Sequence, residues 1–179
     1  MEMQTKEKIN SAFSNLKDKF GYKNTLQTPK VSKVVISTGV GSIQNNKELR
    51  QLIEDRLTLI TGQKVSYCGA LKSIASFKIR EGDIIGYKVT LRGNRMYHFL
   101  DKLFNIALPR TKDFKGISRK CVDEMGNMTL GIREHTIFPE TPDEEIKNVF
   151  GFSISVVTTA SSKEEAESFL EYLGTPFKK

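Results

Sequence analysis

The segment from Ile85 to Arg92 alternates between apolar residues and residues that are small, hydroxylated or basic. A period of two predicts a β-strand, because successive side chains of a strand point to opposite faces of a sheet. The apolar face carries Ile85, Tyr87, Val89 and Leu91, and the other face carries Gly86, Lys88, Thr90 and Arg92. A sheet that packs one face on helices leaves its other face open. This open face suits contact with phosphate and sugar, although a merely solvated sheet face has the same composition.

The remaining elements follow from the same test of periodicity. Extended segments are predicted at 31–38, 64–68, 72–80, 128–132 and 152–159. Apolar residues at helical spacing predict helices at 9–20, 49–60, 94–107 and 162–173. Strands and helices are mixed without strict β-α-β alternation. We therefore predict one α+β domain over residues 1–179, with a mostly antiparallel, RRM-like sheet, helices packed on one face, and long functional loops.

The charge balance favours a polyanionic partner. The chain has a net charge of +7, from 28 basic and 21 acidic residues. Its two cysteines, Cys68 and Cys121, form no CxxC pair, so neither a disulfide framework nor a zinc ribbon is expected. Residues 1–10 lack an apolar signal core, and no apolar run approaches the roughly 20 residues needed to cross a bilayer. We expect a cytoplasmic protein without a membrane partner.

Catalytic and metal motifs are incomplete in this sequence. Gly39-Val40-Gly41 follows a predicted strand but lacks the third glycine of a dinucleotide fingerprint. The two histidines, His98 and His135, have no cluster of cysteine, histidine or carboxylate at metal-binding spacing, and a surface or capping role is expected for them. We predict no catalytic residue, no metal and no cofactor. A small nucleotide-using enzyme built around Gly39 and Gly41 is the alternative from the enzyme class.

A free RNA-binding protein with an RRM-like sheet is a second alternative. Such a protein stacks bases on aromatic side chains of its open face. Phe77, Tyr87 and Phe152 fall on the side predicted to face the core, which counts against this alternative.

Several long blocks resemble the bacterial large-subunit ribosomal protein family that binds 5S rRNA, often called ribosomal protein five. The blocks come in family order and span nearly the whole chain. They are PKVSKVVISTGVG at 29–41, LTLITGQK at 57–64, KSIASFKIR at 72–80, GYKVTLRGNRMY at 86–97, LPRTKDFKGIS at 108–118 and GNMTLGIREHTIFPE at 126–140. The ending Thr175-Pro176-Phe177 is also similar to that of the family.

The resemblance implies a non-catalytic protein that attaches 5S rRNA in the central protuberance of the large subunit. Its implied 5S rRNA face uses Lys33, Ser37, Gly39, Gln63, Lys88, Thr90 and Arg92. Its implied contact with the elbow of the P-site tRNA uses Lys72, Ser73, Lys78 and Arg80. Its implied bridge to a protein of the small-subunit head uses Arg110, Lys112, Asp113, Lys115, Glu140, Asp143 and Glu144. 23S rRNA and neighbouring large-subunit proteins are further implied partners.

The chain departs from the family at two places in these sets. Ser37 stands where the family usually has asparagine, so an amide is lost from the 5S rRNA face. The stretch from Tyr67 to Leu71 is neutral, whereas the family often has several arginines just before Lys72.

Overall fold

The structure, a computed structural model, describes residues 4–43, 46–112, 114–141 and 148–178. The chain forms two compact units. We call residues 35–91 and 131–154 the central unit, and residues 1–34, 92–130 and 155–179 the terminal unit. A single domain over residues 1–179 stays a prediction.

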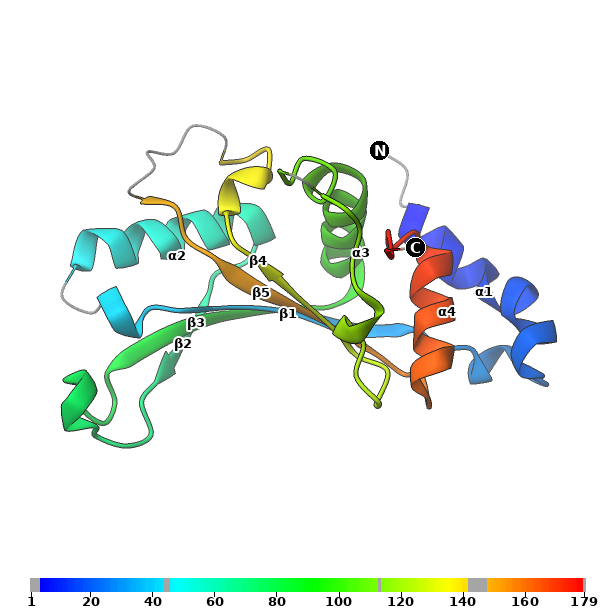
Figure 1. The fold of residues 1–179 in the computed structure, drawn as a ribbon, viewed down its shortest axis with the longest axis horizontal. Helices are drawn as coiled ribbons and strands as arrows, with labels where there is room; N and C mark the ends of the chain where they lie inside the picture. Colours follow the sequence, from blue (N-terminus) through cyan, green and yellow to red (C-terminus); the bar gives the residue numbers. More distant parts are fainter. Residues whose placement is uncertain (1–3, 44–45, 113, 142–147, 179) are drawn as a thin grey trace. The chain divides into compact units, whose positions relative to one another are not determined.

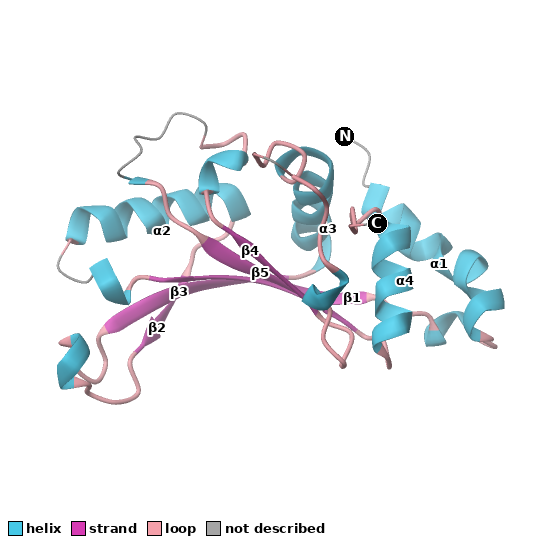
Figure 2. Ribbon diagram, viewed as in Figure 1, coloured by secondary structure: helices cyan, strands magenta, loops and turns pink. Residues whose placement is uncertain are grey.

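The strands form a five-stranded sheet with the order β2-β3-β1-β5-β4. The strands are Val31–Gly39 (β1), Ser66–Gly69 (β2), Ile84–Leu91 (β3), Met128–Ile132 (β4) and Phe152–Thr158 (β5). β2 pairs antiparallel with β3. β1, β4 and β5 each contribute residues to both units. Figure 2 shows these strands in magenta and the helices in cyan. The α+β prediction is confirmed.

In the central unit, the helix Lys47–Thr61 (α2) packs on the sheet (Figure 1). Its apolar stripe buries Ile53, Leu57 and Ile60, and Gly62 ends it in the left-handed conformation, at φ 66°. The side chain of Tyr67, on β2, reaches α2: its hydroxyl donates a hydrogen bond to Glu54 Oε1 at 2.7 Å. This hydrogen bond raises the pKa of Tyr67. The predicted helix and its glycine cap are confirmed.

In the terminal unit, the helices are Gln4–Phe20 (α1), Gly93–Lys102 (α3), which continues into a π-helical turn at Leu103–Ala107, and Lys163–Leu173 (α4). α1 packs against both α3 and α4. The backbone N–H of Thr5 donates to the buried Asp101 at 2.9 Å, which caps the start of α1 from another helix. The Tyr22 hydroxyl donates to Glu165, and burial raises the pKa of Tyr22.

The segment 72–80 is not the extended segment that its alternation predicted. Ala75–Phe77 forms a 3₁₀ turn (η3), closed by backbone hydrogen bonds in both directions between Ile74 and Ile79, at 2.9 and 3.2 Å. The prediction that Phe77 faces the core is wrong, because its side chain is 70% exposed. The alternation is misleading because this segment closes on itself. Tyr87 and Phe152 are buried as predicted.

His135 is not a surface or capping histidine. Its side chain is fully buried and its ring stacks on Phe150, with 4.2 Å between the ring centroids. The backbone N–H of Phe150 donates to His135 Nδ1 at 3.3 Å. His135 therefore helps to pack the 3₁₀ turn His135–Ile137 in the central unit.

Candidate nucleic-acid interface

The central unit presents an open sheet face on β1 and β3. On β3, Tyr87, Val89 and Leu91 are buried, whereas Lys88 is exposed and Thr90 is half-buried. On β1, Ile36 is buried, whereas Ser37 is half-buried and Gly39 is exposed. We call Ser37, Gly39, Gln63, Lys88 and Thr90 the open face. The alternation within β3 is confirmed.

Gln63 joins the open face although it lies outside the strands. It directly follows Gly62, the glycine that ends α2. Its side-chain Nε2 donates to the backbone carbonyl of Thr90 at 3.3 Å. The amide nitrogen is therefore used to hold the side chain against β3, and the amide oxygen remains as an acceptor. A side chain held in this way loses less conformational entropy when it binds a partner.

Hydroxyl groups gather on the same side of the central unit. Ser37 Oγ and Ser153 Oγ lie 2.9 Å apart across β1 and β5. Ser66 on β2 is the register partner of Lys88 on β3. Sequence reasoning missed Ser66 and Ser153 as members of this surface. The alternation of 152–159 marks Ser153 as open-side, but only the pairing of strands places Ser66 beside Lys88.

Gly39 and Gly86 differ in what the fold requires of them. A Cβ atom added at Gly86 would lie 3.0 Å from the carbonyl oxygen of Thr38, so the close approach of β3 and β1 leaves a side chain there little room. A Cβ atom added at Gly39 would meet nothing within 4 Å. The fold itself therefore does not demand glycine at position 39, and the open space is available for a partner.

We expect Gly39→Ala to fold with unchanged stability and to weaken binding of an RNA backbone that approaches β1 closely. An added methyl group that clashes with such a partner costs roughly 1–3 kcal/mol, which is about fivefold to a hundredfold in affinity. Thermal unfolding and an RNA titration check the two halves of this expectation. Unchanged affinity in the folded variant means that no partner backbone packs on Gly39.

Two residues predicted for the same face belong to the terminal unit. Lys33 is half-buried on β1, and Arg92 is exposed at the N-cap position of α3. Lys33 lies four residues before Ser37 on one strand, and Arg92 lies two residues after Thr90. The structure therefore brings together only the residues of the central unit, and the role of Lys33 and Arg92 stays a prediction.

The residues predicted for a tRNA contact share the loop around η3 in the central unit. The side chains of Lys72, Ser73, Lys78 and Arg80 are all exposed. The Ser73 hydroxyl accepts a hydrogen bond from the backbone N–H of Glu81 at 2.9 Å, which helps to hold the loop in shape. Lys78 has φ 54°, in the left-handed region that glycine favours.

The residues predicted for an intersubunit bridge are not brought together. Arg110 and Lys115 are exposed in the terminal unit, as is Lys112, and Glu140 is half-buried in the central unit. Asp113, Asp143 and Glu144 lie outside the described residues. The bridge therefore stays a prediction from the resemblance.

Two comparisons with known proteins indicate one and the same family. The family model described as "Ribosomal protein L5" matches residues 24–80, and a second model, which describes the C-terminus of the same ribosomal family, matches residues 84–177. The chain belongs to the ribosomal protein L5 family. A relative from Thermoanaerobacter sp. (strain X514), "Large ribosomal subunit protein uL5", is 54% identical over 164 residues, which is 92% of each chain. The protein of the same name from Natranaerobius thermophilus is 49% identical over 162 residues, which is 90% of each chain.

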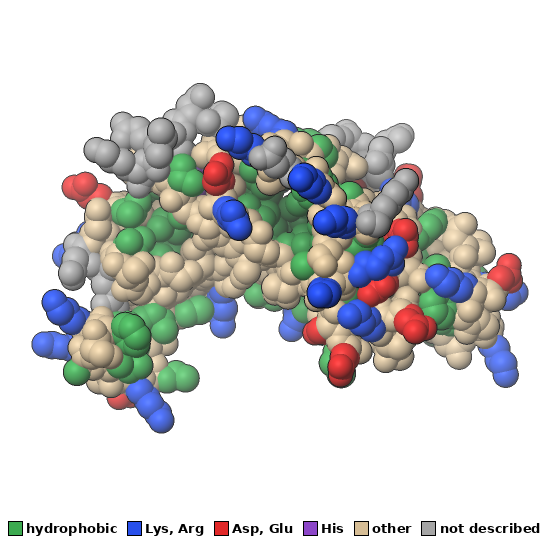
Figure 3. Space-filling model, in the orientation of Figure 1, with side chains coloured by type: hydrophobic (Ala, Val, Ile, Leu, Met, Phe, Trp, Pro, Cys, Tyr) green, Lys and Arg blue, Asp and Glu red, His purple; other side chains and the backbone are tan. Residues whose placement is uncertain are grey.

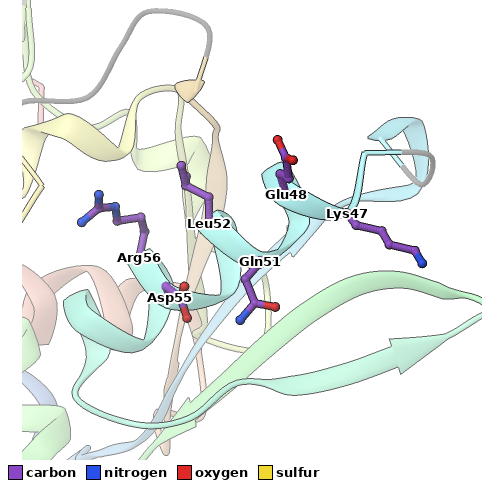
Figure 4. Close-up of a pocket in the computed structure, with 6 residues that line it drawn as sticks. All are labelled: Lys47, Glu48, Gln51, Leu52, Asp55 and Arg56. Atoms are coloured by element: carbon purple, nitrogen blue, oxygen red, sulfur yellow. The ribbon is translucent and has the colours of Figure 1, made fainter.

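Membership of the L5 family excludes the enzyme alternative, because this is a family of structural ribosomal proteins. An open hollow does lie along α2, and Figure 4 shows the side chains that line it. They are Lys47, Glu48, Gln51, Leu52, Asp55 and Arg56. All come from one helix, and neither Gly39 nor Gly41 is among them, so the hollow is no nucleotide site built on those glycines.

The described part of the chain has neither a cluster of metal ligands nor a membrane-spanning helix. No group of three or more histidine, cysteine or acidic side chains there is arranged to hold a metal ion. Within the same ranges, no helix has the length and apolar character to cross a bilayer.

Proposed function

We propose that this chain is a structural constituent of the large ribosomal subunit that binds 5S rRNA with its open face and attaches it in the central protuberance. The observation that carries the proposal is the open face itself. On β3 this face carries the exposed Lys88 and, two residues later, Thr90, whose backbone carbonyl accepts the hydrogen bond that anchors Gln63. The protein works in the ribosome, in the cytoplasm, with 23S rRNA and neighbouring large-subunit proteins as further partners.

The open face supplies the groups that RNA recognition needs. Lys88, together with Lys33 and Arg92, neutralises phosphates and releases their counterions. The hydroxyls of Ser37 and Thr90 and the amide oxygen of Gln63 bond 2′-hydroxyls or base edges, which distinguishes RNA from DNA. Gly39 leaves space for a backbone to approach. Because the strands fix most of these groups and a hydrogen bond to β3 anchors Gln63 before binding, the mechanism is positioning rather than catalysis.

Two further contacts belong to the same proposal. The η3 loop reaches the elbow of the P-site tRNA through Lys72, Ser73, Lys78 and Arg80. The loops around 110–118 and 137–145 form the bridge to a protein of the small-subunit head. A bridge made of exposed charged side chains suits subunits that rotate, because such contacts are individually weak and re-form easily.

The open face argues against a free RNA-binding protein of the RRM type. Such a protein stacks bases on aromatic side chains of the sheet. On the described open-side positions of β1 and β3 there is no aromatic residue, and Tyr87 and Phe152 are buried. Recognition on this sheet therefore rests on charge, hydroxyls and shape.

The test is binding of the purified protein to 5S rRNA and to an unrelated structured RNA of equal length, at two salt concentrations. We expect 5S rRNA to bind about a thousandfold or more tightly, in the range of specific nucleic-acid binders, and affinity to fall with salt. Equal binding of both RNAs, or no binding, contradicts 5S-specific recognition by the free protein.

A further inference from the structure

The η3 loop carries large apolar side chains that the fold leaves in water. Leu71 is 90% exposed, Phe77 is 70% exposed and Ile74 is 45% exposed. Figure 3 shows hydrophobic and basic side chains side by side on this projecting loop. Exposed apolar residues scattered singly are ordinary, but a group on one short loop indicates an interaction surface. None of these apolar residues is in the set of charged and polar residues proposed above for the tRNA contact.

The loop is held in shape by its own backbone. Besides the pair of bonds between Ile74 and Ile79, the N–H of Ala70 donates to the carbonyl of Asp83 at 2.8 Å, and the N–H of Gly82 donates to the carbonyl of Ala70 at 3.0 Å. These bonds close the loop at both its base and its tip. Phe77 is therefore presented on a preformed turn, which lowers the entropy cost of binding.

The charges around this apolar group indicate which partner covers it. Lys72, Lys78 and Arg80 flank it, and between residues 71 and 82 these three cations stand against one acidic residue, Glu81. In the described part of the chain, no ion pair involves these three side chains. A flat aromatic ring between unpaired cations fits a nucleic acid, because the ring stacks on a base while the cations meet the flanking phosphates.

Backbone strain at the turn also supports a nucleic-acid partner. Lys78 occupies the left-handed region, at φ 54° and ψ 33°, immediately after Phe77. Glycine or asparagine adopts this conformation at lower cost. Lys78 thus directly follows Phe77 in the chain at the end of the turn.

We propose that the η3 loop binds an unpaired base of a structured RNA by stacking it on Phe77, with Leu71 and Ile74 against the adjoining sugar. The inference rests on the proposed tRNA contact and changes which interaction dominates it. The contact is mainly stacking, and the cations of Lys72, Lys78 and Arg80 add a smaller ionic share.

The test uses the full chain and two RNA probes. One is a hairpin with 2-aminopurine unpaired in its loop, and the other is a hairpin of the same length with 2-aminopurine paired in its stem. We expect the protein to prefer the first probe and to quench its fluorescence. Phe77→Ala lowers that affinity by about tenfold and abolishes the quenching. Phe77→Tyr retains both. Leu26→Ala, which removes another apolar side chain that is 78% exposed, changes neither.

Other outcomes separate the stacking from the rest of the proposed function. If Lys78→Ala weakens binding and Phe77→Ala does not, the loop contacts RNA by charge alone and the stacking is overturned. If neither variant changes binding, the RNA contact of the loop fails altogether. If sedimentation shows that Phe77→Ala converts a dimer into a monomer, a second copy of the chain covers the patch and the proposal is overturned. Binding of 5S rRNA, titrated in parallel, stays unchanged by Phe77→Ala and reports on the open face alone.

Discussion

We expect Lys88→Glu to weaken binding of 5S rRNA by roughly a hundredfold, and Lys88→Ala by about tenfold. Lys88 is exposed at the middle of the open face, so its ammonium group can reach a phosphate without moving the strand. The alanine variant loses one released counterion, which lowers the slope of log affinity against log salt by about one. The glutamate variant adds repulsion to this loss. Titrations of 5S rRNA at several salt concentrations measure both quantities.

The matched control for this prediction is Lys47→Glu, which makes the same change in net charge within the same unit. Lys47 is exposed at the start of α2, a helix that packs on the other side of the sheet. We expect Lys47→Glu to change 5S rRNA affinity by less than about threefold, as long-range screening at physiological salt implies. Equal losses from both glutamate variants mean that net charge, rather than the open face, drives binding. Both variants should unfold at the wild-type temperature, because both side chains are exposed.

Much of the fold was predictable because helices and strands with one buried side have regular periods. β3 is the clearest case, since its alternation gives both the buried face of Tyr87 and Val89 and the open face of Lys88 and Thr90. The η3 loop is the opposite case. Its alternation imitates a strand, but strand pairing depends on distant residues, and here Ile74 pairs with Ile79 within the loop. His135 was misjudged because its charged neighbours in the sequence say nothing of Phe150, on which its ring stacks.

The candidate site was predictable in its chemistry but not in its anchoring. Lys88 and Thr90 follow from alternation, whereas the family resemblance alone indicated Gln63. The hydrogen bond from Gln63 Nε2 to the Thr90 carbonyl joins the end of a helix to a strand, and local sequence carries no record of such a bond. The same holds for Ser66, which reaches Lys88 only through the register of β2 and β3. Contacts between distant segments need the folded chain.

We expect Gly116→Ala to destabilise the terminal unit by about 2–4 kcal/mol, from left-handed strain and overpacking together. Gly116 has φ 91°, and an added Cβ atom would lie 2.9 Å from the backbone nitrogen of Lys178. That approach is fixed by two backbone hydrogen bonds: Ile117 N–H to the Pro176 carbonyl at 2.7 Å, and Lys178 N–H to the Ile117 carbonyl at 2.8 Å. Urea unfolding measures the loss of stability.

This arrangement makes the C-terminal tail an anchor for the loop that carries Arg110 and Lys115. The Arg119 guanidinium lies 5.3 Å from the centre of the Phe177 ring and forms an ion pair with Glu167 at 3.2 Å, so the tail is also held from its side. Phe177→Ala removes this contact without introducing a clash. It should therefore cost less stability than Gly116→Ala while raising hydrogen exchange at the same Ile117 and Lys178 amides. Wild-type exchange at both amides in the two variants would show that the tail does not anchor the loop. 5S rRNA affinity should stay at the wild-type value in both, because neither position is among the residues proposed to bind 5S rRNA.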